Sequence, residues 1–322
     1  MKKQFAFVFI LIIILAVSYF GYRFISGENN SIISPLPKFL TSFSNRQVST
    51  LDVWTPVFQG IGSYIHGDKK EAVPQVTARS VLIYDLTDNK VIFDKNSNSK
   101  VPIASLTKIM TAIISLENPK KDNKYLVRKE DLVGEDSVGF SEGEILSLND
   151  LLYGLILHSG NDAAETLANN FYDGRSGFIK AMNDKAKALG LKNTNFTNPS
   201  GLEGDGHQYS TARDLLVITR YALLNPTFSK IAAMADYTIP KTSTHGEYYM
   251  ENETNLLTTY PGVKGVKTGY TPEAGFCLIT YLDYEEHKII GILLGSENRR
   301  QEMRELLDYS LKTLGIKPPI YK

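Results

Sequence analysis

The chain reads Pro102-Ile-Ala-Ser-Leu-Thr-Lys-Ile-Met-Thr-Ala112 at the start of an apolar stretch that meets no glycine and no further proline up to Ile114. We expect Ser105–Ile114 to form a buried helix, because apolar residues predominate and nothing interrupts the run. On this helix Ser105 and Lys108 are three residues apart, which places their Cβ atoms about 5–6 Å apart on one face. The lysine amine can then accept the serine proton, provided that burial and nearby cations lower its pKa. The N-terminus of the helix also favours negative charge that develops near Ser105.

Two further motifs follow this S-x-x-K along the chain. Ser159-Gly160-Asn161 is an S-x-N in a glycine loop after an apolar stretch, and Lys267-Thr268-Gly269 is a K-T-G that occurs once. The first two patterns are weak alone, because they also occur elsewhere, at Ser97–Lys100, Ser147–Asn149 and Ser296–Asn298. The prediction of a catalytic site therefore rests on the order, spacing and local structure of all three motifs.

Local sequence separates the first motif from its repeat. Ser97 lies among turn-forming residues just before Pro102, so Lys100 is not expected to share a helical face with it. For an isolated S-x-x-K we would assign Ser105 to a helix cap and Lys108 to solvent. Only the joint presence of the three motifs favours the catalytic interpretation.

We predict different roles for the second and third motifs. Ser159 supplies a second hydroxyl that relays protons to the leaving group, and Asn161 supplies an amide that holds Lys108 or the substrate backbone. Residues 265–270 look like an edge strand that opens into a turn, along which an extended peptide can pair, and Gly269 lets that peptide approach closely. The alternative is structural, with the S-x-N ending a helix and the K-T-G forming an ordinary surface turn.

The surrounding pattern predicts an α+β fold. Ser80–Tyr84 and Val91–Phe93 flank one turn, Phe276–Leu282 and Lys288–Leu294 flank another, and each pair reads as a hairpin. Helices are expected at residues 105–114, 151–157, 178–189, 215–224 and 299–314. The order of strands, helices, strands and a last helix indicates an antiparallel sheet made from both ends of the chain, with a helical insert between them.

Composition excludes several classes of protein. The chain has 322 residues, of which 43% are hydrophobic and 22% charged, which suits a globular protein and excludes bulk disorder. Lys+Arg and Asp+Glu both number 35, so no basic excess exists for binding nucleic acid. Cys277 is the single cysteine and lies in an apolar stretch, which predicts an inert buried thiol and not a nucleophile.

The N-terminus carries a hydrophobic segment. Lys2 and Lys3 precede an uncharged apolar run from Phe5 to Phe20 that continues towards Arg23. About 18 residues at about 1.5 Å each reach about 27 Å, close to the hydrocarbon thickness of a membrane. The lysines place the N-terminus inside and the remainder of the chain outside.

A cleaved signal peptide is the alternative, because Ala16 and Ser18 satisfy a small-x-small cleavage site. The run is longer than a usual signal core, which favours an uncleaved single-pass anchor. We predict an anchor or signal segment at residues 1–26, an extracytoplasmic linker at 27–75 and the catalytic domain at 76–322.

The three motifs in this order are shared by penicillin-binding proteins and class A β-lactamases. The segments around them resemble the D-alanyl-D-alanine carboxypeptidase family of low-molecular-mass penicillin-binding proteins, from about residue 77 to 314. The resemblance lies in Pro102–Ala112, Leu157–Ala164, Ala186–Thr194, Asn198–Leu202, Gly265–Gly275 and Asn298-Arg299. It implies a β-lactamase/transpeptidase-like fold, in which an antiparallel sheet is flanked by helices and carries an all-helical subdomain.

The resemblance also implies an acyl-enzyme mechanism on cell-wall peptides. Ser105 would attack the carbonyl between two terminal D-alanines, with Lys108 as general base and with the backbone N–H groups of Ser105 and Tyr270 as the oxyanion hole. Ser159 and Asn161 would organise proton transfer. Water would release the acyl group, and no metal or organic cofactor is needed.

The third motif would bind the substrate in this scheme. Lys267, which is followed in the motif by Thr268 and Gly269, would take part in proton transfer. Thr268 and Arg299 would bind the terminal carboxylate. Arg300 is adjacent and is the alternative for the arginine. The implied partners are peptidoglycan peptides ending in D-Ala-D-Ala, β-lactam antibiotics that acylate Ser105, and the membrane.

Three rival functions stay open from the sequence. A β-lactamase would hydrolyse its acyl-enzyme fast, often through a loop glutamate such as Glu203. A D,D-endopeptidase would cut cross-links with the same motifs. A non-catalytic penicillin-binding scaffold is disfavoured, because every motif residue is present.

Overall fold

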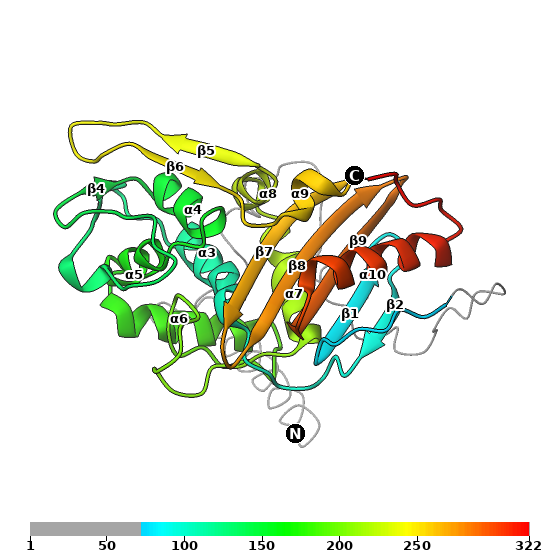
Figure 1. Cartoon of the computed structure of the whole chain (residues 1–322). Helices are drawn as coiled ribbons and strands as arrows, with labels where there is room; N and C mark the ends of the chain where they lie inside the picture. The colour runs from blue at the N-terminus through cyan, green and yellow to red at the C-terminus, as the bar shows by residue number, and fades with distance from the viewer. Residues whose placement is uncertain (1–71, 322) are drawn as a thin grey trace, which may run out of the picture. The chain divides into compact units, whose positions relative to one another are not determined.

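The structure is a computed structural model, and it describes residues 72–321. A five-stranded antiparallel sheet in the order β2-β1-β9-β8-β7 runs through it (Figure 1). Its strands are β1 (Ser80–Asp85), β2 (Lys90–Lys95), β7 (Val263–Thr271), β8 (Gly275–Tyr284) and β9 (His287–Ser296). β1 pairs with β9 from Ser80↔Leu294 to Asp85↔Ile289. Both predicted hairpins and the α+β fold, with one sheet made from both ends of the chain, are confirmed.

The helical insert lies between β2 and β7, as predicted, and Figure 1 shows most of it beside the β7 edge of the sheet. Its helices are η2 (Ala104–Thr107), α3 (Lys108–Glu117), η3 (Lys129–Asp131), α4 (Leu148–Ile156), α5 (Asn161–Asn169), α6 (Gly174–Ala188), α7 (Ala212–Leu223), α8 (Pro226–Ala232) and α9 (Leu256–Thr259). Short strands also occur there, namely β3 (Tyr125–Leu126), β4 (Ile145–Leu146), β5 (Asp236–Ile239) and β6 (Tyr248–Glu251). The last helix, α10 (Arg299–Thr313), follows β9 and crosses one face of the sheet.

Both faces of the sheet are covered, and β1 shows why. Val81 and Ile83 pack in a cluster that contains Leu307 of α10, whereas Leu82 and Tyr84 belong to the larger core of the insert. Successive side chains of a strand point to opposite faces. Because every residue of β1 is buried, the strand needs a hydrophobic layer on each side, and the two layers lie on opposite faces of the sheet.

Four predicted helix starts are wrong. α6 begins at Gly174 and not at residue 178, and α7 begins at Ala212 and not at residue 215. The segment expected to be helical from Ser105 opens as the 3-10 turn η2, and the α-helix begins only at Lys108. α4 begins three residues before the predicted residue 151, because Ser147 caps it: its hydroxyl accepts a hydrogen bond from the Asp150 backbone N–H, and the Asp150 carboxylate accepts one from the Ser147 N–H. The repeated S-x-N at Ser147 is therefore a helix cap.

The predicted anchor at residues 1–26 and nearly all of the predicted linker at 27–75 lie outside the described residues. Within residues 72–321, no helix is both long and apolar enough to cross a membrane. The domain boundary at residue 76 stays a prediction.

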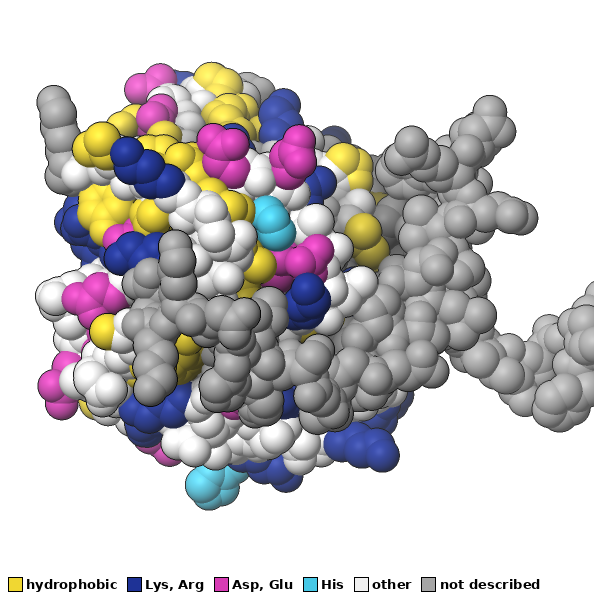
Figure 2. Space-filling model, turned by 90° about the vertical axis from the view of Figure 1, so that its right-hand side faces the viewer, with side chains coloured by type: hydrophobic (Ala, Val, Ile, Leu, Met, Phe, Trp, Pro, Cys, Tyr) yellow, Lys and Arg dark blue, Asp and Glu magenta, His cyan; other side chains and the backbone are white. Residues whose placement is uncertain are grey.

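On the face that Figure 2 presents, basic and acidic side chains are interspersed, in keeping with the equal totals of 35 for the two charge types.

The loop that precedes α4 is held by one buried carboxylate. Asp162, the second residue of α5, is fully buried and accepts hydrogen bonds from the N–H groups of Val138 (3.0 Å), Gly139 (2.9 Å) and Phe140 (3.2 Å). It also accepts one from the Ser137 hydroxyl at 2.6 Å. A carboxylate at the start of a helix is favoured by the helix dipole. Asp162 therefore ties residues 137–140 to the first turn of α5.

We predict that Asp162→Ala lowers the free energy of unfolding by about 2–4 kcal/mol, because it leaves the N–H groups of residues 138–140, of which Phe140 is buried, without their acceptor. Urea unfolding followed by circular dichroism measures the change. Asp184→Ala is the matched control. Within the described residues, Asp184 pairs only with two exposed lysines, Lys180 at 2.5 Å and Lys187 at 3.8 Å, and its effect should stay below about 0.5 kcal/mol. Equal small losses in both variants would contradict the role given to Asp162.

Candidate active site

The Lys108 amine is the centre of a group of hydrogen bonds that brings distant segments together. Its Nζ lies 2.8 Å from Ser105 Oγ, 2.7 Å from Asn161 Oδ1 and 2.8 Å from the Ser200 carbonyl oxygen. Lys108 is fully buried, and Ser105 is only 8% exposed. The structure therefore joins the predicted nucleophile, the predicted base and the asparagine of the second motif through one nitrogen atom.

Burial holds the pKa of Lys108 well below its ordinary value, and the neighbouring Lys267 ammonium lowers this pKa further. Glu253, Asp136 and Asp162 oppose the shift more weakly. A lysine whose pKa is lowered in this way is a neutral amine over more of the pH range. A neutral amine has a lone pair, so Lys108 can accept the Ser105 hydroxyl proton.

Ser200 was missed by the sequence reasoning. Its segment lies against α3, because the Thr111 hydroxyl donates to the Pro199 carbonyl at 2.6 Å. Within the segment, the Gly201 N–H donates to Asn198 Oδ1 at 2.7 Å. Asn198–Leu202 stands out only through its family resemblance, and a backbone carbonyl leaves no side-chain signal in the sequence. The segment supplies the third acceptor of the Lys108 amine.

Glycines allow two segments to approach the nucleophile closely. A Cβ at Gly201 would lie 2.1 Å from the Ala104 carbonyl oxygen and 2.9 Å from Ser105 N, and Gly201 has a φ of +92°. A Cβ at Gly269 would lie 3.0 Å from Ser105 N and 3.2 Å from the Ile103 carbonyl oxygen. The predicted reason for Gly269 was room for substrate. The structure adds that β7 itself packs against the turn that carries Ser105.

The K-T-G motif lies on β7, which is an edge strand of the sheet, as predicted. Lys267 is 1% exposed, and its Nζ donates to the Thr268 carbonyl at 3.2 Å. Thr268 donates its hydroxyl to Glu253 Oε2 at 2.8 Å, and the same oxygen is 3.9 Å from Lys267 Nζ. Burial lowers the pKa of Lys267 to about 8, and Arg299 lowers it as well, against the opposing effect of Glu253. Glu253 lies in no motif, so no sequence pattern pointed to it.

Arg299 lies on the β7 and β8 edge of the sheet. Its guanidinium donates to the Gly269 carbonyl at 2.9 Å and is 5.3 Å from the Phe276 ring centroid. Tyr270, whose backbone is the second predicted oxyanion donor, packs its ring against Phe276 with the centroids 4.7 Å apart. Arg300 is exposed. Of the two arginines, Arg299 is the one that contacts the K-T-G strand.

Ser159 lies in the turn between α4 and α5, with a φ of +61°, and is 1% exposed. Asn161 begins α5, and its backbone N–H and side-chain amide donate to the carbonyls of Asp136 (2.8 Å) and Glu135 (2.9 Å). These bonds fix the amide oxygen toward Lys108. The role of the Ser159 hydroxyl as a proton relay stays a prediction.

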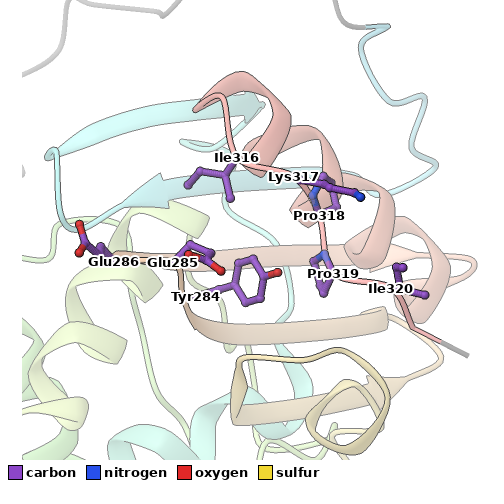
Figure 3. Close-up of a pocket in the computed structure, with 8 residues that line it drawn as sticks. All are labelled: Tyr284, Glu285, Glu286, Ile316, Lys317, Pro318, Pro319 and Ile320. Carbon is purple, nitrogen blue, oxygen red and sulfur yellow. The ribbon is translucent and has the colours of Figure 1, made fainter.

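The cavity drawn in Figure 3 is separate from this group of residues. It has a volume of about 640 Å³ and lies between the β8–β9 turn and the C-terminal segment, with Tyr284 and Ile316–Ile320 among its lining residues. Tyr284 ends β8 seven residues after Cys277, which pairs with Gly269. At about 3.4 Å per residue, the cavity begins about 24 Å along the strand from the K-T-G. Cys277 itself is fully buried, as predicted.

Comparisons with known proteins agree with this arrangement. Residues 68–298 match the sequence model of a peptidase family described as D-alanyl-D-alanine carboxypeptidase. The chain is 33% identical over 255 residues to the D-alanyl-D-alanine carboxypeptidase DacF of Bacillus subtilis, a match that covers 76% of this chain and 64% of DacF. It is 36% identical over 219 residues to a D-alanyl-D-alanine endopeptidase of Escherichia coli, covering 64% of this chain and 67% of that protein. The chain thus spans about two thirds of the length of these relatives.

The crystal structure of a Streptomyces DD-transpeptidase is similar to this one, with a TM-score of 0.71 and 30% sequence identity. The similarity covers 75% of this chain and 100% of the solved chain. The predicted β-lactamase/transpeptidase-like fold is therefore confirmed.

We predict that Gly201→Ala reduces the rate of Ser105 acylation by a labelled penicillin at least about tenfold, because the new Cβ would meet the backbone beside the nucleophile. Gly204→Ala is the matched control. Gly204 lies in the same loop with a φ of +109°, so the backbone strain is similar, but nothing lies within 4 Å of its Cβ position. Equal losses in the two variants would mean that strain, and not contact with the nucleophile turn, causes the effect.

The two lysines predict a bell-shaped dependence of acylation on pH. The rate should rise as Lys108 loses its proton, below the ordinary lysine value of 10.5, and should fall as Lys267, with a pKa of about 8, becomes neutral. A stopped-flow profile of the second-order rate constant measures both limbs. In Lys267→Arg the guanidinium keeps its charge, so the alkaline limb should move well above pH 8. An unchanged alkaline limb in this variant would contradict the assignment.

Proposed function

Because the chain belongs to the D-alanyl-D-alanine carboxypeptidase family of serine peptidases, we propose that it removes the last D-alanine from peptidoglycan stem peptides ending in D-Ala-D-Ala. The observation that carries the proposal is the 2.8 Å contact between the buried Lys108 amine and the Ser105 hydroxyl. A serine hydroxyl in contact with a buried lysine whose pKa is lowered meets the requirement for an activated nucleophile.

The proposed first half-reaction forms an acyl-enzyme. Ser105 Oγ attacks the carbonyl of the penultimate D-alanine while its proton passes to Lys108 Nζ. The N–H groups of Ser105 and Tyr270 stabilise the negative oxygen of the tetrahedral intermediate, and each such donor is worth about 10²–10³ in rate. The intermediate collapses, the C–N bond breaks, and a proton delivered through Ser159 leaves with the D-alanine amine.

The proposed second half-reaction hydrolyses the acyl-enzyme. A water molecule gives a proton to Lys108 Nζ as its oxygen attacks the ester carbonyl. The ester C–O bond then breaks, and Lys108 returns the proton to Ser105 Oγ. Asn161 holds the Lys108 amine in place throughout, since its Oδ1 lies 2.7 Å from Nζ. Every step uses groups of the chain, water and the peptide.

The proposed binding of the substrate uses the cations at the β7 edge. Lys267 and Arg299 attract the terminal carboxylate, and the Thr268 hydroxyl donates to it. The peptide pairs along β7 as an added strand, because an edge strand has free backbone N–H and C=O groups. A β-lactam with its own carboxylate would bind in the same way and acylate Ser105.

We place the catalytic domain outside the cytoplasm. The apolar run after Lys2 and Lys3 supports a single-pass anchor in the bacterial cell membrane, and the peptidoglycan substrate lies outside. Secretion after cleavage of a signal peptide is the alternative for this segment.

Specific observations bear on two alternatives to a carboxypeptidase, namely an endopeptidase and a β-lactamase. The 36% identity to a D-alanyl-D-alanine endopeptidase favours cleavage of cross-links as the second candidate. A β-lactamase would need Glu203 to activate water. The Glu203 carboxylate instead accepts a hydrogen bond from the Glu273 N–H at 2.9 Å, and hydrogen bonds from Thr271 and this N–H lower its pKa. The carboxylate therefore holds the β7–β8 turn.

We predict that the purified full chain releases D-alanine from a peptide ending in Lys-D-Ala-D-Ala, and that Ser105→Ala lowers this rate more than about 10³-fold. Free D-alanine is measured with a coupled oxidase. Ser97→Ala, in the repeated S-x-x-K, is the matched control and should keep the rate, because the Ser97 hydroxyl bonds Asp94 at 2.7 Å and not a lysine.

Any other result of these assays would show which part of the proposed function is wrong. Release that persists in Ser105→Ala would show that the nucleophile is wrong. Acylation by labelled penicillin without D-alanine release would favour the endopeptidase, which cross-linked dimers then test. Turnover of nitrocefin above about 1 s⁻¹, a modest enzyme rate, would favour a β-lactamase.

A further inference from the structure

The Glu253 carboxylate contacts both Lys267 and Thr268 of the K-T-G motif, and neither the motifs nor the proposed mechanism uses it. It lies in the loop between β6 and α9, where its backbone N–H donates to the Leu157 carbonyl at 3.2 Å. The preceding Asn252 is also anchored, because its side-chain amide donates to the carbonyls of Ala232 (3.1 Å) and Met234 (2.9 Å). The backbone of the loop is therefore fixed, and the Glu253 side chain projects from it to β7.

The Glu253 carboxylate lies where the proposed mechanism puts the carboxylate of the substrate. Its Oε2 accepts the Thr268 hydroxyl proton at 2.8 Å and is 3.9 Å from Lys267 Nζ. Thr268 and Lys267 are 2% and 1% exposed, so their contacts with this carboxylate are screened little by water. The side chain of Glu253 is 36% exposed, so it can turn outward without unpacking a core.

A threonine hydroxyl has a single proton to donate. In the structure this proton points to Glu253, so a substrate carboxylate can receive it only after the Glu253 carboxylate has moved away. The two carboxylates also compete for the same cation, Lys267, and repel each other if both are present. Binding of a free C-terminal carboxylate therefore includes the displacement of an internal one.

We propose that Glu253 determines specificity by occupying the carboxylate subsite of the enzyme. The inference rests on the proposed function, and it names the substrate class that this subsite favours. Glu253 lowers the advantage of a substrate with a free terminal carboxylate over one in which that position is uncharged, such as an amidated peptide or a peptide that continues beyond the scissile bond. Before substrate binds, the same carboxylate balances the charge of Lys267 beside Thr268.

Glu253→Gln tests this assignment, because it removes the charge and keeps the size and an acceptor oxygen. The probes are benzylpenicillin, which carries a carboxylate, and its uncharged methyl ester. The second-order rate constant for acylation of Ser105 is measured with each probe on the full chain, and their ratio is the preference for a carboxylate. A general weakening of the nucleophile cancels in this ratio, so a merely structural role of Glu253 would not change it.

We expect the preference for the carboxylate to rise about tenfold in Glu253→Gln, a shift of about 1.4 kcal/mol. Glu251→Gln is the matched control. It removes the same charge two residues away on β6, where the exposed carboxylate contacts only the Tyr249 hydroxyl at 3.0 Å, and it should leave the ratio unchanged. Glu253→Ala should raise the ratio at least as far, because it also frees the Thr268 proton.

The outcomes separate this inference from the function on which it rests. Normal acylation with an unchanged ratio in both Glu253 variants would overturn the inference and leave the proposed function intact. A ratio that rises equally in Glu251→Gln would overturn it too, because the effect would then be one of general charge. If no form of the protein is acylated by either probe, the proposed function fails and the inference fails with it.

Discussion

The hydrogen bonds of the buried Lys108 amine are the constraint on which the rest of the site depends. An amine without access to water must find its partners within the protein, since an unsatisfied buried polar group is costly. Its three acceptors come from the nucleophile turn, from the first residue of α5 and from the backbone at Ser200. Gly201 and Gly269 must also approach the nucleophile at the same time. Together, these contacts leave few ways for the helical insert to pack against the sheet edge.

The parts of this arrangement that could be predicted are local in the sequence. Ser105 and Lys108 are three residues apart, so helical geometry alone brings them together, and the two hairpins follow from strand patterns around short turns. The Ser200 carbonyl is 92 residues from Lys108 and has no side-chain signature, so no pattern could reveal it. The 3-10 turn before Lys108 lies where Gly201 approaches Ala104, a tertiary contact that the local sequence does not show.

The charges of the site illustrate a conflict between stability and chemistry. Burial lowers the pKa of both Lys108 and Lys267, which means that the folded state disfavours the charged form of each. A sequence selected for stability alone would replace such groups with apolar residues. Buried lysines with lowered pKa values are instead typical of a functional site, and here Lys267 lies near Arg299 and the Glu253 carboxylate.

The pairing of β1 with β9 also determines when the protein can fold. Ser80 and Leu294 are neighbours in the sheet although more than 200 residues separate them in the chain. During synthesis at about 5–20 residues per second, the β1–β2 hairpin would wait about 10–40 s before its partner strand exists. The central strands cannot assemble earlier, and such distant contacts slow folding further. A growing chain of this topology therefore lacks its complete sheet until β9 has been synthesised, and β1 keeps one edge unpaired throughout that time.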